Sequence, residues 1–281
     1  MKKPQLITIG TAVFLVAVIY YYGRTTPNRT VSVAGNPVQS ARTGSLTDTI
    51  LNMAKSQIKP EQVIRLTTLE NSISRGAVKD QRLKIYHHLA HFWKDSAGLF
   101  LPYAFYEAEA ARLENSENSL TFAARLFLEN LQQEQSVDFR RWEALQARDL
   151  FERSLIINPD NDSAKVGLGA CYLFGNISAA PMEGIAKIKE VLDKDSTNVY
   201  AQMTFVNGLL ISGQYEKAIS RLQVINQLQS NNLEAILMLA DTYERMNDKA
   251  NALKWYQRSL RLVPNEKMKG AIEKRIEDLK K

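Results

Sequence analysis

The stretch ILMLADTYERMNDKANALKWYQRSLRLVP, residues 236–264, decides the fold of this chain. Its apolar and small residues predict two helices joined by a turn. Ala240 and Ala252 are small because the helices of a hairpin approach most closely at these positions, and a larger side chain would push them apart. Pro264 ends the second helix, since proline cannot continue one. The stretch therefore predicts one helix–turn–helix unit.

The spacing at the end of this stretch occurs twice. Intervals of four and eight residues separate two sets of small, aromatic and proline residues: Ala147, Phe151 and Pro159, and Ala252, Tyr256 and Pro264. The sets lie 105 residues apart, which is three periods of 34 residues and an insertion of three. An intermediate copy is present, because Ala218 lies 34 residues before Ala252. A fixed period near 34 predicts stacked helical hairpins.

Over roughly residues 82–264, this pattern resembles the tetratricopeptide repeat (TPR) family. The resemblance implies an all-α solenoid of helix–turn–helix units. It implies about five repeats, of which the two nearest the N-terminus are degenerate. The resemblance specifies the fold more closely than the function, because the same framework carries unrelated ligands.

Two connections depart from the family pattern. A slack turn over residues 175–181 holds an insertion, and Gly184 then takes the second small position of that repeat. Further upstream, the stretch 132–141 is about ten residues too long for a standard turn between two helices.

The segments flanking the repeats have their own patterns. Residues 45–81 predict a helical hairpin that caps the stack, and Ser45 with Asp48 forms a plausible N-cap pair. Residues 265–281 predict a C-terminal capping helix with a solvated Lys- and Glu-rich face. Residues 24–44 are rich in Thr, Asn, Pro, Gly and Ser, which predicts a flexible linker.

The N-terminus carries an apolar segment. Residues 1–5 are a short basic tail, and residues 6–23 contain no charged side chain. This length is just sufficient to cross a bilayer, so it predicts a single transmembrane anchor. The alternative is a cleaved signal peptide, whose cleavage site should follow within a few residues. The nearest small-x-small site is residues 32–34, well beyond the apolar segment, which favours the anchor.

The charges beside the anchor are nearly balanced. Lys2 and Lys3 precede the span, and three arginines follow it at Arg24, Arg29 and Arg42. A short basic tail before the first apolar segment normally stays in the cytoplasm. We therefore expect a cytoplasmic N-terminus and an extracytoplasmic repeat domain, periplasmic in a bacterium. The opposite orientation stays open.

The distribution of charge argues against nucleic acid as a partner. The net charge is +6, and residues 1–80 carry ten Lys or Arg against four Asp or Glu. Residues 81–281 carry 26 of each sign, so the repeats are neutral. A nucleic-acid-binding face needs a concentrated basic surface.

All three histidines lie within five residues. His87 and His91 are one helical turn apart and are a weak candidate for a metal site. His88 occupies the place where a metalloprotease motif has glutamate, so that motif is absent. Ordinary groove or surface histidines are the alternative that we favour. The chain has no phosphate loop or nucleophile elbow, and we expect no enzyme activity, cofactor or small-molecule substrate.

The resemblance also implies a concave groove that binds peptides. In the family, positions 2, 5, 9 and 12 of each first helix line this groove, and Leu89 and Ala90 count as positions 7 and 8. The resulting groove residues are Lys84, His87, His91, Lys94, Val166, Ala170, Leu173, Tyr200, Met203, Asn207, Leu210, Leu237, Asp241 and Glu244. They predict a basic end, an apolar middle and an acidic end, which suits an amphipathic helix or an apolar peptide. The alternative is that the N-terminal hairpin covers the middle.

These patterns lead to two hypotheses about function. The first is a single-pass, membrane-anchored TPR scaffold or adaptor that binds protein or peptide partners and takes part in envelope complex assembly. The second is a structural subunit of a larger membrane complex, or a self-association module, in which the groove is buried. An accessible groove would favour the first hypothesis.

Overall fold

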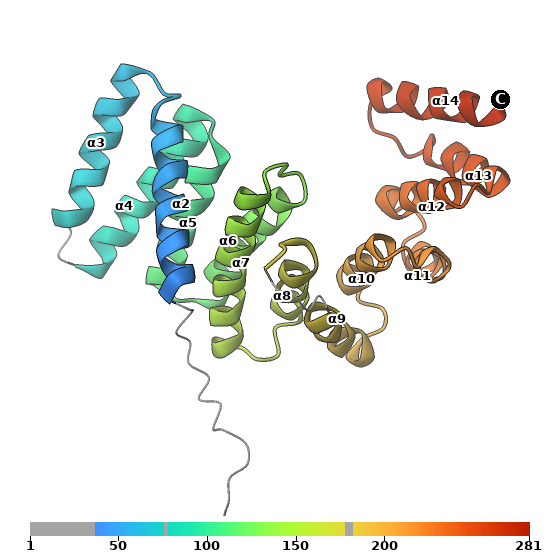
Figure 1. Cartoon of the computed structure of the whole chain (residues 1–281), viewed down its shortest axis with the longest axis horizontal. Coiled ribbons are helices and arrows are strands. Elements are labelled where there is room, and N and C mark those ends of the chain that lie inside the picture. Colours follow the sequence, from blue (N-terminus) through green and yellow to red (C-terminus); the bar gives the residue numbers. More distant parts are fainter. Residues whose placement is uncertain (1–36, 76–77, 178–181) are drawn as a thin grey trace, which may run out of the picture. The chain divides into compact units, whose positions relative to one another are not determined.

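A computed structural model describes residues 37–75, 78–177 and 182–281 (Figure 1). Within these ranges the chain forms helices and no strand, which confirms the all-α prediction for this part. None of the helices in these ranges is both long and apolar enough to cross a membrane. The predicted basic tail, the predicted anchor 6–23 and the first part of the predicted linker lie outside the described residues.

Thirteen α-helices and one π-helical turn follow one another in the described ranges. They are α2 (Pro37–Lys55), α3 (Pro60–Arg75), α4 (Lys79–His91), η1 (Phe92–Ala97), α5 (Phe100–Glu114), α6 (Glu117–Leu131), α7 (Val137–Ile157), α8 (Asp162–Phe174), α9 (Met182–Lys194), α10 (Val199–Ile211), α11 (Tyr215–Leu228), α12 (Leu233–Arg245), α13 (Lys249–Ser259) and α14 (Glu266–Lys280).

Residues 49–281 form one compact unit, in which consecutive helices pack as hairpins. The pairs are α4 with α5, α6 with α7, α8 with α9, α10 with α11, and α12 with α13 (Figure 1). The second helix of each pair contacts the first helix of the next pair, and α14 packs on α13. This arrangement is a solenoid of helical hairpins.

The first helices of the later hairpins start in the same way. An asparagine side chain at each N-cap accepts a hydrogen bond from the backbone N–H three residues on, at Asn161, Asn198 and Asn232. This bond satisfies one of the free N–H groups at the helix start. Asn265 caps α14 identically, so α14 begins as the first helix of a further repeat would.

The structure adds helix at two of the connections. Helix α2 begins at Pro37, so residues 37–44 of the predicted linker are helical. The stretch 132–141 is mostly helix, because α7 begins at Val137 and continues for 21 residues. Ser136 starts it by accepting a hydrogen bond from the Phe139 N–H. The extra residues therefore lengthen α7.

The hairpin of α8 and α9 depends on two glycines. A Cβ atom added to Gly184 would lie 2.4 Å from the Gly169 carbonyl oxygen, and one added to Gly169 would lie 2.7 Å from the Gly184 carbonyl oxygen. Neither distance is tolerated between a Cβ atom and backbone. Helices α8 and α9 therefore approach closely enough to exclude any side chain at either position.

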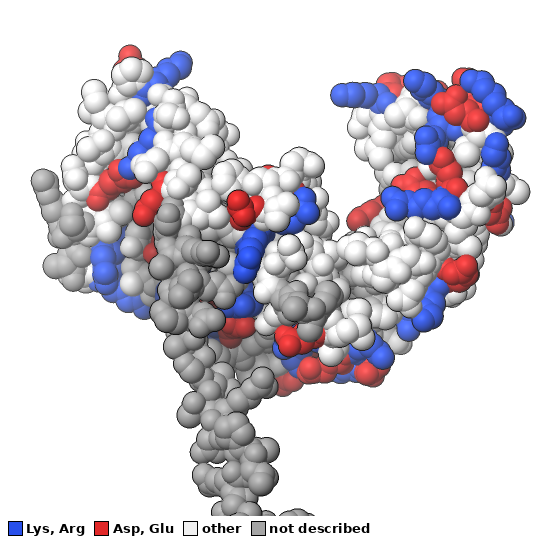
Figure 2. Space-filling model, in the orientation of Figure 1, with Lys and Arg blue, Asp and Glu red and all other residues white. Residues whose placement is uncertain are grey.

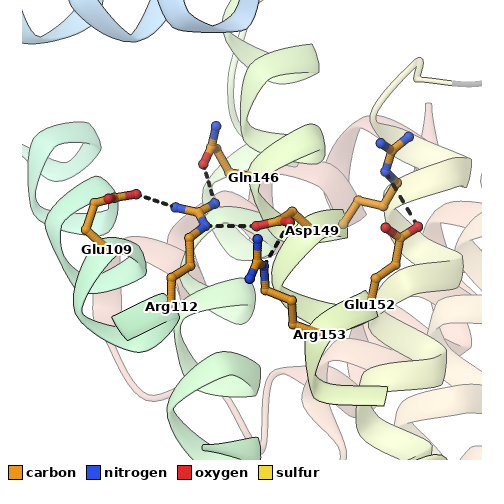
Figure 3. Close-up of polar contacts among 7 residues, drawn as sticks. Glu109, Arg112, Gln146, Asp149, Glu152 and Arg153 are labelled. Carbon is orange, nitrogen blue, oxygen red and sulfur yellow. Dashed lines mark hydrogen bonds and ion pairs between the residues drawn. The ribbon is translucent and has the colours of Figure 1, made fainter. Parts of the chain in front are cut away.

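A polar network joins α5 to α7, the second helices of two neighbouring hairpins (Figure 3). Arg112 on α5 donates hydrogen bonds to Glu109, Gln146 and Asp149 over 2.6 to 2.8 Å. Burial opposes ionisation of Asp149, but the Arg112 and Arg153 guanidinium groups outweigh it and lower the pKa of that carboxyl. The network thus ties the two hairpins together through charged groups that all have partners.

Candidate protein-binding site

The predicted basic end lies on α4 and η1, and its side chains already have neighbours. Lys84, His91 and Lys94 are exposed, and His87 is half-buried. His87 Nδ1 lies 3.5 Å from a Glu107 carboxylate oxygen, and Lys94 Nζ lies 5.2 Å from the centre of the Tyr103 ring.

The weak metal candidate gains no further ligand in the described part of the chain. His91 Nδ1 lies 3.2 Å from an Asp95 carboxylate oxygen, whereas His87 faces Glu107 on α5. No group of three or more His, Cys, Asp or Glu side chains positioned to hold a metal ion occurs among residues 37–75, 78–177 and 182–281. The two histidines instead pair with different carboxylates.

The predicted apolar middle is largely closed. Val166, Ala170 and Met203 are buried, and Val166 packs in a core cluster with Ile188 and Val191. Ala170 still lines a small cavity, and the groove as a whole stays a prediction. Val166 and Met203 do not line an open surface. The reason is that neighbouring first helices pack against each other, as α8 does with α10. Four predicted residues of α8 and α10 stay half-buried: Leu173, Tyr200, Asn207 and Leu210.

The acidic side chains of the predicted acidic end on α12 already have hydrogen-bonding partners on α13 and α14. The Tyr256 hydroxyl donates to Asp241 and, over 2.9 Å, to Glu244, and Arg275 of α14 donates to Glu244 over 2.9 Å. Burial and these two carboxylates raise the pKa of Tyr256 well above its usual value. Figure 2 shows Lys and Arg beside Asp and Glu over the helices α12–α14. Helix α14 therefore offsets part of the acidic charge, while Leu237 beside it is half-buried.

Two adjoining cavities lie along α6, α8 and α10. The larger, of about 490 Å³, is lined by Asn118, Thr121, Phe122, Arg125, Leu126, Glu129, Asn161 and Ser163. The smaller, of about 70 Å³, is lined by Arg125, Leu128, Glu129, Gln132, Ala170, Phe174, Tyr200 and Thr204. Arg125 and Glu129 line both cavities. The two cavities therefore form one continuous surface, which we call the α6–α8–α10 surface.

Arg125 is central to this surface. Its guanidinium carbon lies 5.9 Å from the centre of the Tyr200 ring, and its side chain is 53% exposed. Within the described ranges Arg125 donates no hydrogen bond, and its ion pair with Glu129 is long at 3.8 Å. Burial raises the pKa of Tyr200 to about 12, so the ring under Arg125 stays neutral. The guanidinium thus lies at the outer limit of cation–π distance from the Tyr200 ring, with donors available to a ligand.

The sequence prediction missed the α6 part of this surface. Counting Ala123 and Ala124 as positions 7 and 8 gives groove positions at Asn118, Thr121, Arg125 and Leu128, all of which line the cavities. The same rule that was applied to the other first helices therefore finds these residues. Phe122, which is 52% exposed, follows no such rule and was visible only in the structure.

The fold and this surface define a class of protein, a helical-hairpin repeat protein with a candidate binding surface on its first helices. Residues 209–274 match the model of the tetratricopeptide repeat family. The resemblance seen in the sequence is therefore supported for that segment, which contains α11, α12 and α13. No curated protein matches the chain.

Several solved structures are similar at low identity. YrrB, described as a TPR protein with an unusual peptide-binding site, is 14% identical; the match covers 73% of this chain and 97% of that one, with a TM-score of 0.42. MamA from Desulfovibrio magneticus RS-1 is 19% identical, with 64% and 94% covered and a TM-score of 0.45. Yeast Tom70 is 11% identical, with 96% and 78% covered and a TM-score of 0.33.

Proposed function

We propose that this protein is a non-enzymatic scaffold that binds a peptide segment of a partner protein on the α6–α8–α10 surface. The observation that carries the proposal is Arg125, a half-exposed cation beside the Tyr200 ring that lines both cavities and has no hydrogen-bonding partner among the described residues. Two residues of the predicted groove, Tyr200 and Ala170, line the smaller cavity.

The lining suits a peptide because it alternates polar and apolar groups. Amide and hydroxyl side chains, at Asn118, Ser163 and Thr204, can pair with the polar main chain of a peptide in an extended conformation. Phe122 and Phe174 offer ring surface to its apolar side chains. The same surface offers no nucleophile paired with a base, so it supports binding without chemistry.

We further propose that residues 6–23 anchor the chain in a membrane, with a cytoplasmic N-terminus and an extracytoplasmic repeat domain that takes part in envelope complex assembly. The support is the uncharged 18-residue segment behind Lys2 and Lys3. An anchor would hold the binding surface near membrane-bound partners.

The binding proposal is tested by crosslinking and pull-down of the full-length chain from native membranes. Arg125→Glu with Phe122→Asp should lower recovery of the partner at least about tenfold, because one buried charge pair or anchor contact contributes roughly 1.4 kcal/mol or more. The matched control is Arg261→Glu with Ile211→Asp, which reverses one arginine charge and replaces one apolar side chain by aspartate at exposed residues outside both cavities. Equal recovery of the partner with both folded variants would refute the proposal that the partner binds on this surface. It would favour the structural-subunit hypothesis.

The anchor proposal has a separate test. Deletion of residues 6–23 should move the protein from the carbonate-resistant membrane fraction to the soluble fraction, because the remaining described helices contain no membrane-spanning segment. Protease added to spheroplasts, whose cytoplasmic membrane is intact, should digest the repeat domain only if that domain is extracytoplasmic. A full-length chain already found in the soluble fraction would contradict the anchor.

A further inference from the structure

A cavity of about 280 Å³ lies where the end of α2, the start of α5 and the α6–α7 turn meet. It shares no lining residue with the α6–α8–α10 surface. Most of its wall is apolar, including Ile50, Leu101, Pro102 and Phe139. Met53 at its edge is 49% exposed, so the cavity opens to solvent. It is accordingly a second candidate binding site with a different chemistry.

Each of the three polar side chains of the wall has an oxygen that can still accept a hydrogen bond. Asn130 uses its amide nitrogen to donate to Glu143 over 2.6 Å, which leaves the Asn130 side-chain oxygen. Gln57 donates its amide nitrogen to the Met53 carbonyl over 3.2 Å, which likewise leaves its oxygen. Glu134 contributes a carboxylate, of which one oxygen accepts from the Ser136 N–H over 2.7 Å. The polar part of the cavity therefore accepts hydrogen bonds and carries negative charge.

The neighbouring cation does not cancel this charge by direct pairing. Arg140 donates over 3.1 Å to the main-chain carbonyl of Glu134, and no ion pair joins it to the Glu134 carboxylate within the described ranges. An incoming cation would thus meet a carboxylate that is not already paired with an arginine.

The size of the cavity restricts the occupant. Cofactor and drug-sized ligands occupy pockets of roughly 300 to 1,000 Å³. About 280 Å³ lies at the lower limit of that range, which leaves room for a single long side chain. A lysine has an apolar four-carbon stem and three N–H donors at its end, which match an apolar wall and three acceptor side chains.

We propose that this cavity receives a lysine side chain of a partner protein, with the stem against Leu101 and Phe139 and the ammonium at Glu134, Asn130 and Gln57. This cavity binds a positively charged group at the end of an apolar stem. The α6–α8–α10 surface instead presents a cation of its own, Arg125. The two sites therefore select opposite charges on partner chains.

Blocked tripeptides test this assignment on the full-length protein labelled with ¹³C at its methionine methyl groups. The Met53 methyl signal, assigned by its loss in Met53→Leu, is followed during titration with Leu-Lys-Leu, Leu-norleucine-Leu and Leu-Glu-Leu. The dissociation constant of the lysine peptide should be roughly tenfold lower than that of the norleucine peptide, because a hydrogen bond to a charged group contributes about 1.5 kcal/mol or more. Glu134→Gln should reduce this ratio to below about threefold.

The control is Glu216→Gln, which removes an exposed carboxylate of α11 outside this cavity and outside the α6–α8–α10 surface, and should leave the ratio unchanged. Glu134→Gln keeps the side-chain oxygen that accepts from Ser136, so the variant should fold. Equal affinity for the lysine and norleucine peptides, or no shift of the Met53 signal, would overturn the proposal. Binding of free hexylammonium without binding of the lysine tripeptide would overturn its assignment to a protein partner.

Discussion

Glu143→Gln should raise the free energy of unfolding of the α6–α7 hairpin by up to about 4 kcal/mol at pH 8 and leave it unchanged near pH 4.5. Glu143 lies on α7, is fully buried and accepts a hydrogen bond from Asn130 over 2.6 Å. Its second carboxyl oxygen has no partner among the described residues. Burial raises the pKa of Glu143 from 4.5 to about 8. The folded hairpin therefore keeps the carboxyl protonated at neutral pH.

The sign of the effect follows from proton binding. Between pH 4.5 and 8 the folded state holds a proton on Glu143 that the unfolded state has lost. The stability of the wild-type hairpin consequently falls as the pH rises through this window and levels off above about 8. Glutamine remains neutral in both states, so the difference between variant and wild type grows with pH.

Hydrogen exchange of the α6 and α7 amides at several pH values measures this difference locally, which matters because repeat arrays do not always unfold in one step. The control is Glu216→Gln, which makes the same change at an exposed residue of α11. A Glu143→Gln difference that stays constant from pH 4.5 to 8 would show that Glu143 ionises normally inside the hairpin.

Gly184→Ala should lower the free energy of unfolding of the α8–α9 hairpin by about 2 to 3 kcal/mol. The added methyl group would lie 2.4 Å from the Gly169 carbonyl oxygen and 3.0 Å from the Tyr172 Cβ atom. The first of these is backbone of the facing helix, so the two helices would have to separate. In an exposed helix the same substitution normally stabilises, because alanine has the higher helix propensity.

Gly270→Ala provides the matched control, because Gly270 lies in α14 with no atom within 4 Å of an added Cβ. This variant should gain up to about 1 kcal/mol. Thermal or urea unfolding of the two variants beside wild type should thus give shifts of opposite sign. A gain in stability for Gly184→Ala would contradict the close approach of α8 and α9.

Part of the candidate site could be predicted from the sequence, and part could not. The counting rule that applies to first helices identifies Tyr200 and, when extended to α6, Arg125. It also selected Val166, whose burial depends on packing against α9 and α10. The counting rule gives the direction of a side chain on its helix, but it does not report how closely the next hairpin packs.

At the predicted acidic end, the sequence likewise identified the helix that carries the residues but not the partners that they contact. Asp241 and Glu244 were correctly placed on one helix, yet their charge is offset by Arg275, 31 residues after Glu244. No local pattern marks Arg275, because α14 has many exposed charges. Only the packing of α14 on α13 selects one of them as a partner.

The sequence by itself determined that this chain forms helical hairpins, and which residues mark their close contacts. The small residues Gly184, Ala218 and Ala252 recur with the repeat period of 34 residues, and the space that they leave is a local property of two adjacent helices. The tertiary structure alone decided which groove positions stay accessible and which charges stay unpaired. Accessibility and pairing depend on side chains from other hairpins, whose approach is set by packing of the whole unit and not by any single repeat.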